Sequence, residues 1–225
     1  MAHILLLETA TTNCSVGISK AGELLFLRER NTPDYSHSEQ LHLFIKEALQ
    51  GASLSFSDLD AVAVSKGPGS YTGLRIGVSA AKGICFSRDL PLISIPTLEV
   101  LARQITAGPQ ELVVPVLDAR RMEVYSAVYD HHYREIRETR AEIVEAGSFG
   151  EYVGVDKVYF LGSGAQKIKE TVAGDNFSFD PNSVPSAAQM VQVAYRKFQA
   201  SQFEDLAYFE PYYLKDFLIQ AKKKS

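Results

Sequence analysis

The chain has 225 residues, so we expect either one large domain or two small ones. With 46% hydrophobic and 22% charged residues, it has the composition of a globular protein that can bury a sizeable core. The formal net charge of -4 argues against unaided binding of nucleic acid, since neutralising phosphates takes clustered lysine and arginine, and we interpret the basic run at residues 222–224 as a solvated tail.

The cysteines and the N-terminus indicate where the protein resides. Cys14 and Cys85 are far apart and fit no CxxC spacing, which predicts a reducing compartment without a disulfide framework. The N-terminal apolar run, residues 4–7, ends at a glutamate and is too short for a signal peptide or a membrane span. The expected location is therefore the cytoplasm.

The first half of the chain is predicted to form three strands followed by alternating helices and strands. Short apolar or alternating runs place the three strands at residues 3–8, 14–19 and 23–30. Residues 36–39 have the spacing of a capping box, and an apolar stripe follows, so a helix is expected over 36–50. The remaining expected elements are a strand at 59–65, a loop at 67–72, a helix at 73–86, a strand at 91–95 and a helix at 97–105.

The second half is predicted to repeat this order. Strands are expected at 112–117, 122–129 and 135–144, then a short helix, a strand at 157–161, a helix opened by 162–164, and a longer helix at 186–200. The repetition indicates an α/β fold made of two copies of a strand-strand-strand-helix-strand-helix unit. We predict one lobe at residues 1–107 and a smaller one, with the C-terminal helix and tail, at 108–225.

The most unusual stretch is KGPGSYTGLR at residues 66–75. Its glycines permit tight turns after a strand, and the following helix offers unpaired N–H groups and the positive end of its dipole. Arg75 is expected in the first helical turn, where a cation is mildly disfavoured, so it is predicted to meet an anion or a buried carboxylate. The alternative is a structural turn with Arg75 in an ordinary ion pair. The spacing is not that of a P-loop.

Other catalytic or metal chemistry is not indicated. The first hairpin, residues 8–12, resembles the first phosphate loop of actin-like ATPases and sugar kinases, but its acid is Glu8 in place of Asp and the usual glycines are missing, which favours a structural hairpin. His37 and His42 are about 140° apart on a helix and cannot share a metal. His131 and His132 point to different faces of a strand. We expect no metal, no cofactor and no catalytic nucleophile.

The predicted helix at residues 73–86 is apolar over most of its circumference. A narrow stripe of mostly small residues runs along it, formed by Gly73, Gly77, Ala80, Ala81 and Ile84. Such a helix is either buried between layers of its own domain or covered by a partner, and the sequence leaves both alternatives open. Leu43, which lies off the main stripe of the preceding helix, adds to the candidate surface.

Four stretches resemble the TsaB (YeaZ) family. They are SHSEQL at 36–41, GPGSYTGLRIG at 67–77, LDARRMEVY at 117–125 and PYYLK at 211–215. The resemblance covers the whole chain, and the eleven-residue stretch is its most specific part. The chain departs from the family pattern at three positions: Glu8 stands where Asp is usual, Tyr71 where Phe is common, and Lys215 where Arg is common. Glu8 argues further against a role in binding nucleotide phosphates.

This resemblance implies two ribonuclease-H-like lobes of the actin, sugar kinase and Hsp70 superfamily. It also implies a non-catalytic scaffold subunit required for making N6-threonylcarbamoyladenosine (t6A) next to the anticodon of tRNA. The implied partners are a paralogous TsaD-type transferase, whose metal-binding HxxxH motif this chain lacks, and a TsaE-type ATPase, with tRNA met only through the complex. The rival interpretations are an actin-like phosphotransferase, a glycoprotease-like metallopeptidase and a free-standing nucleotide-binding module.

On this basis, the helices at 36–50 and 73–86 are predicted to pair with the equivalent helices of the transferase, or with a second copy when the chain is alone. The expected interface residues are Leu43, Gly73, Arg75, Ile76, Gly77, Ala80, Ala81 and Ile84. A structural loop is expected at Gly67, Pro68, Gly69, Ser70, Tyr71 and Thr72. We expect this loop to cap the second helix and to direct Arg75 towards the cleft or the interface. No membrane association is expected.

Overall fold

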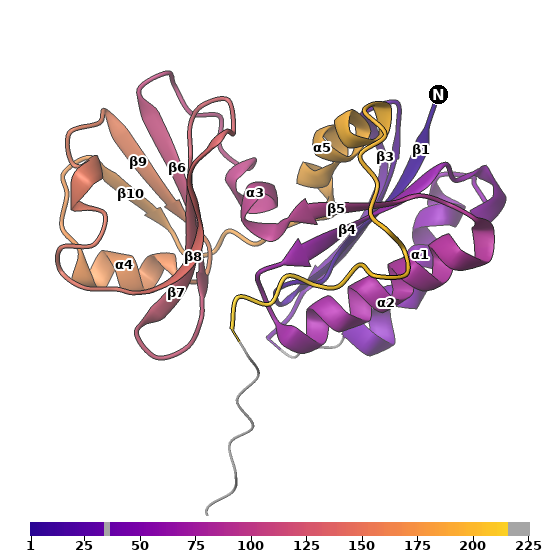
Figure 1. Cartoon of the computed structure of the whole chain (residues 1–225), viewed down its shortest axis with the longest axis horizontal. Helices are drawn as coiled ribbons and strands as arrows, with labels where there is room; N and C mark the ends of the chain where they lie inside the picture. The colour runs from indigo at the N-terminus through magenta and orange to yellow at the C-terminus, as the bar shows by residue number, and fades with distance from the viewer. Residues whose placement is uncertain (34–36, 216–225) are drawn as a thin grey trace, which may run out of the picture.

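The computed structural model describes residues 1–33 and 37–215, in which the strands form two five-stranded sheets. Each sheet is the centre of one lobe, and the two lobes lie side by side (Figure 1). Ser36, the first residue of the predicted capping box, and the basic run at 222–224 lie outside the described residues.

The first sheet joins an antiparallel meander to two parallel strands. Its strands are β1 (His3–Glu8), β2 (Asn13–Lys20), β3 (Glu23–Asn31), β4 (Ala61–Gly67) and β5 (Leu92–Pro96). Their order is β3-β2-β1-β4-β5, so β1 is central. Residues 4–8 of β1 are all buried, as expected for a strand that is covered on both faces.

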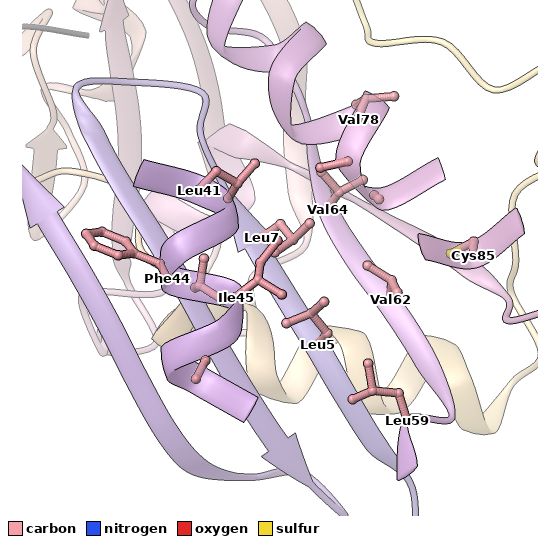
Figure 2. Close-up of a cluster of buried hydrophobic side chains, with 14 of the residues drawn as sticks. Leu5, Leu7, Leu41, Phe44, Ile45, Leu59, Val62, Val64, Val78 and Cys85 are labelled. Atoms are coloured by element: carbon pink, nitrogen blue, oxygen red, sulfur yellow. The ribbon is translucent and has the colours of Figure 1, made fainter. Parts of the chain in front are cut away.

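Helices cover both faces of this sheet. They are α1 (His37–Gly51), α2 (Tyr71–Arg88), α3 (Thr97–Ala102) and α5 (Ala187–Gln199), with a short 3-10 turn at Phe56–Asp58. Because side chains alternate along a strand, Leu5 and Leu7 of β1 pack with Leu41 of α1 and Val78 of α2 (Figure 2). The intervening Ile4 and Leu6 pack on the opposite face with α5.

The second sheet repeats the arrangement of the first. It contains β6 (Glu111–Asp118), β7 (Glu123–Tyr129), β8 (Glu135–Ile143), β9 (Lys157–Leu161) and β10 (Phe177–Asp180), with α4 (Ala165–Thr171) and a 3-10 turn at Gly150–Tyr152. The order β10-β9-β6-β7-β8 matches that of the first sheet strand for strand. This confirms the predicted duplication. The predicted unit has four strands, whereas each copy has five: the sequence predicts β5, at residues 91–95, but not β10.

Three details differ from the sequence-based expectations. Tyr71 and Thr72, expected in the loop, form the first turn of α2, and the helix expected to end at residue 105 ends at Ala102. α5 follows the second sheet in the chain but packs on the first (Figure 1). The division at residue 107 separates the two sheets and remains a prediction as a domain boundary. None of the described helices is both long and apolar enough to cross a bilayer.

After α5 the chain turns back across the first lobe. We call residues 203–215 the C-terminal strap; it runs in yellow along α2 in Figure 1 and then towards the second lobe. A single bridge joins its Glu204 to Leu92 of β5.

Candidate functional site

The loop between β4 and α2 is held against the first hairpin by hydrogen bonds. Ser70 N donates to the carbonyl oxygen of Ala10 at 2.7 Å. The Ser70 side chain accepts a hydrogen bond from Gly73 N at 3.2 Å, so Ser70 is the N-cap of α2, as the sequence predicts for this loop. The cap satisfies one of the unpaired N–H groups at the start of the helix.

The inner side of α2 carries the glycines of the small-residue stripe. A Cβ atom at Gly73 would overlap the carbonyl oxygen of Thr9, and one at Gly77 would overlap the Thr9 side chain. Thr9 Oγ1 donates to the carbonyl oxygen of Gly73 at 2.8 Å across this close approach. Gly73, Gly77 and Ala81 are therefore buried inside their own lobe. This corrects their assignment to the partner surface.

The outer side of α2 and the first half of α1 form an open groove of about 690 Å³, which we call the α1–α2 groove. It is lined by Ser38, His42, Tyr71, Thr72, Arg75, Ile76, Ser79, Ala80, Gly83 and Ile84. Its apolar part comes from Ala80, which is 9% exposed, and from the half-buried Ile76 and Ile84. Four of the eight predicted interface residues thus lie together in this groove, whereas Leu43 is 52% exposed but is not among the lining residues.

Several groove residues were not predicted from the sequence. Ser79 and Gly83 are exposed on α2, and a Cβ atom at Gly83 would meet nothing within 4 Å. Ser79 and Gly83 follow Arg75 at intervals of four residues, so all three share one face of the helix. This periodicity is the signal that would have found them.

Arg75 lies on the exposed rim of the groove. It follows Tyr71, the first residue of α2, by four positions and is therefore in the second helical turn, not the first. Its Nη1 donates to Tyr71 Oη at 3.0 Å, and its guanidinium carbon is 5.3 Å from the centre of the Tyr71 ring. Within residues 1–33 and 37–215, no carboxylate lies at ion-pair distance from Arg75, so neither the predicted buried carboxylate nor an ordinary ion pair is found there.

Glu8, at the end of β1, is turned into the lobe. Its carboxylate accepts hydrogen bonds from the Ser65 hydroxyl and from Ala10 N, the latter at 2.6 Å. Burial raises the pKa of Glu8 to about 7, and the three hydrogen bonds from Ser65, Ala10 and Thr9 only partly offset that effect. The Glu8 side chain is therefore buried in the lobe and stabilises the first hairpin through its hydrogen bonds.

Contrary to the prediction, His131 and His132 do not point to different faces of a strand: they lie in the turn between β7 and β8, and their ring centres are 3.8 Å apart. His37 and His42, in contrast, do not share a site. His37 is buried, its Nε2 lies 2.7 Å from the carbonyl oxygen of Thr11, and burial lowers its pKa. His42 is exposed at the groove. In the part of the chain that the structure describes, no three His, Cys, Asp or Glu side chains are placed to hold a metal ion together.

Comparison with known proteins relates the chain to proteins of tRNA modification. The family model described as "TsaD: tRNA N6-adenosine threonylcarbamoyltransferase" matches residues 33–224. The chain is 37% identical over 123 residues to the tRNA threonylcarbamoyladenosine biosynthesis protein TsaB of Haemophilus influenzae. This match covers 54% of the chain and only 51%, about half, of the relative's length. The TsaB protein of Escherichia coli is 29% identical over 227 residues, covering 95% of each protein.

Solved structures agree with the fold. YeaZ from Pseudomonas aeruginosa superimposes with a TM-score of 0.83 at 24% identity, covering 95% of this chain and 100% of that one. A protein described as similar to peptidase YEAZ, from the same organism, has a TM-score of 0.86 at 24% identity and covers 96% and 100% of the two chains. The predicted α/β fold of two ribonuclease-H-like lobes is thereby confirmed.

Proposed function

The chain belongs to the family described as TsaD, tRNA N6-adenosine threonylcarbamoyltransferase, and within it to the TsaB (YeaZ) proteins, and we propose that it is a non-catalytic scaffold subunit required for t6A formation on tRNA. In this proposal the chain binds and supports a TsaD-type transferase. Relatives from Haemophilus influenzae, Escherichia coli and Bacillus subtilis that carry the name of a t6A biosynthesis protein support the pathway.

The observation that carries the proposal is the α1–α2 groove. It exposes the half-buried Ile76 and Ile84 beside the charged Arg75, so it combines apolar area with a polar rim, as protein interfaces do. Ser79 and Gly83 add no bulky side chains to the groove, which lets a partner helix approach closely. Because one family model covers both this chain and TsaD-type transferases, equivalent helices of the two proteins can pair about a pseudo-two-fold axis.

The first hairpin supports the non-catalytic part of the proposal. Glu8, where actin-like enzymes place a metal-organising acid, is occupied by hydrogen bonds from Ser65 and Ala10. Thr9, the next residue, is used to hold α2 through the Gly73 carbonyl. The sequence also contains no HxxxH motif.

The remaining partners follow from the same proposal. A TsaE-type ATPase is the third component, and tRNA is bound by the assembled complex, in keeping with the net charge of -4 on this chain. The lobe at residues 1–107 supplies the docking surface. A second copy of the chain occupies the groove when the transferase is absent, because exposed apolar surface favours association.

The proposal is tested in cells that lack their own copy of this gene, with t6A in digested tRNA measured by mass spectrometry. The wild-type chain is expected to restore t6A. Gly83→Arg is expected not to, because the exposed helical site accepts the side chain without a clash while a cation then fills the groove. Ala80→Arg is a weaker test, since Ala80 also packs in the core between the first sheet and helices α1 and α2.

Gly154→Arg is the matched control. It makes the same change at an exposed glycine of the second lobe where a Cβ atom also meets nothing within 4 Å. Arg75→Ala is expected to lower t6A while the protein remains folded. If Gly83→Arg and Gly154→Arg restore t6A equally, the groove is not required; if the wild-type chain restores none, the proposed pathway is wrong.

A further inference from the structure

The C-terminal strap is fixed to the first lobe along its length. The Phe209 side chain is buried in the same core as α1 and α2. Lys82 of α2 donates from Nζ to the carbonyl oxygens of Ala207 and Phe209, at 3.2 and 2.9 Å. Further along, Tyr212 N donates to the carbonyl oxygen of Lys66 at 2.7 Å. The strap is therefore a built part of the lobe, with anchors on both α2 and the end of β4.

The strap passes over the loop that leads into α2. Gly67 has a φ of +114°, and a Cβ atom there would overlap the carbonyl oxygen of Tyr212. Glycine thus permits the strap to lie directly on the loop backbone. Beyond this point Lys215 forms an ion pair with Glu123 on β7 of the second lobe. Tyr213 is held between these two anchors.

Tyr213 contacts the groove through one aromatic ring. The centres of the Tyr213 and Tyr71 rings are 5.0 Å apart, with the ring planes at 38°. Tyr71 in turn receives the hydrogen bond from Arg75 and lies beneath its guanidinium group. Tyr71 and Arg75 line the α1–α2 groove, whereas Tyr213 does not. The three side chains form a continuous series of contacts from the strap to the rim of the groove.

We propose that Tyr213 is a positioning residue for partner docking: it fixes Tyr71, and Tyr71 presents the Arg75 guanidinium to the incoming protein. This inference rests on the proposed function of the groove. An exposed arginine has many rotamers, and ordering it on binding is costly. A guanidinium already held by a hydrogen bond and a ring loses less freedom, so the strap raises affinity without contacting the partner itself.

The binding experiment titrates a TsaD-type transferase into the purified full chain and its variants by calorimetry. Tyr213→Ala is expected to weaken affinity about three- to tenfold, the range of one aromatic contact, and Tyr213→Phe to retain it because the ring remains. Tyr208→Ala is the matched control, since Tyr208 belongs to the same strap and is 85% exposed. In an Arg75→Ala background, Tyr213→Ala is expected to cause no further loss, which separates positioning from a general structural role.

A second readout needs no partner. NMR relaxation of the Arg75 Nε–H group in the free chain is expected to show faster motion in Tyr213→Ala than in wild type. Unchanged Arg75 motion, or an equal loss of affinity with and without Arg75, overturns the positioning role. If the wild-type chain binds the transferase and Tyr213→Ala binds equally well, this inference alone fails; a wild-type chain that does not bind overturns the proposed function.

Discussion

The buried carboxyl group of Glu8 is expected to make the stability of the protein depend on pH. Its folded-state pKa is raised from 4.5 to about 7, with burial as the largest cause. The folded protein therefore holds this proton more tightly than the unfolded chain does. Between about pH 4.5 and 7, folding keeps a proton that unfolding releases, so the free energy of unfolding falls as pH rises through this window.

The size of the effect follows from the pKa change. At about 1.4 kcal/mol per pH unit, moving the pKa of Glu8 from 4.5 to about 7 lowers the free energy of unfolding by roughly 3 kcal/mol at pH 8 relative to pH 4. Glu8→Gln removes this titration. The neutral amide oxygen can still accept the hydrogen bond from Ala10 N, and the amide group can still pair with the Ser65 hydroxyl.

The assay is urea unfolding followed by circular dichroism at several pH values from 5 to 8. His37 titrates in the opposite sense, because burial lowers its pKa and protonation below about pH 6.5 destabilises the folded state. The difference between wild type and Glu8→Gln isolates Glu8. The variant is expected to gain relative stability as pH rises. A difference that stays constant from pH 5 to 8 would refute the reasoning.

The other predictions concern packing, and they are measured by urea or thermal unfolding or, for the strap, by limited proteolysis. Gly77→Ala is expected to destabilise the protein by about 1–3 kcal/mol, because the added Cβ atom overlaps Thr9. Gly83→Ala is expected to stabilise it by about 0.5–1 kcal/mol, because alanine has the higher helix propensity and the added Cβ atom meets nothing. Effects of the same sign would contradict this assignment of the two faces of α2. Phe160→Ala is expected to cost about 3–5 kcal/mol, because Phe160 is fully buried among the aromatic rings of the second core, and a loss below 1 kcal/mol would contradict that packing. Lys82→Met is expected to speed proteolytic cleavage of the strap, because two strap carbonyl groups lose their donor; unchanged cleavage would contradict this anchoring role.

Much of the fold could be predicted because hydrophobic periodicity is local. The alternation in β2 and the apolar stripe of α1 place these elements within a residue or two of their observed bounds. β10 was missed because it has only four residues, all of them partly or fully exposed at the sheet edge. The packing of α5 on the first sheet is a tertiary contact, and an amphipathic helix does not encode which sheet it covers.

The candidate site was predictable only in part, because a glycine in a helix can either be required by a close neighbour or lie on an open surface. Gly77 is small because Thr9 approaches it, whereas Gly83 faces open space, and the sequence gives both the same letter. The apolar circumference of α2 indicated that more than one face of this helix is buried in its own lobe or available to a partner. The strap has no periodicity that predicts its path, so the contact between the Tyr213 and Tyr71 rings follows from the structure alone.

The central claim is that a TsaD-type transferase docks in the α1–α2 groove. The direct test is the dissociation constant of the purified transferase for wild type, Gly83→Arg and Gly154→Arg, each first shown to be folded by circular dichroism. We predict that Gly83→Arg weakens binding by about 100-fold or more, since a cation buried in the groove by the partner is left without a counter-charge, and that Gly154→Arg binds like wild type. A folded Gly83→Arg protein that binds the transferase as tightly as wild type would contradict the claim.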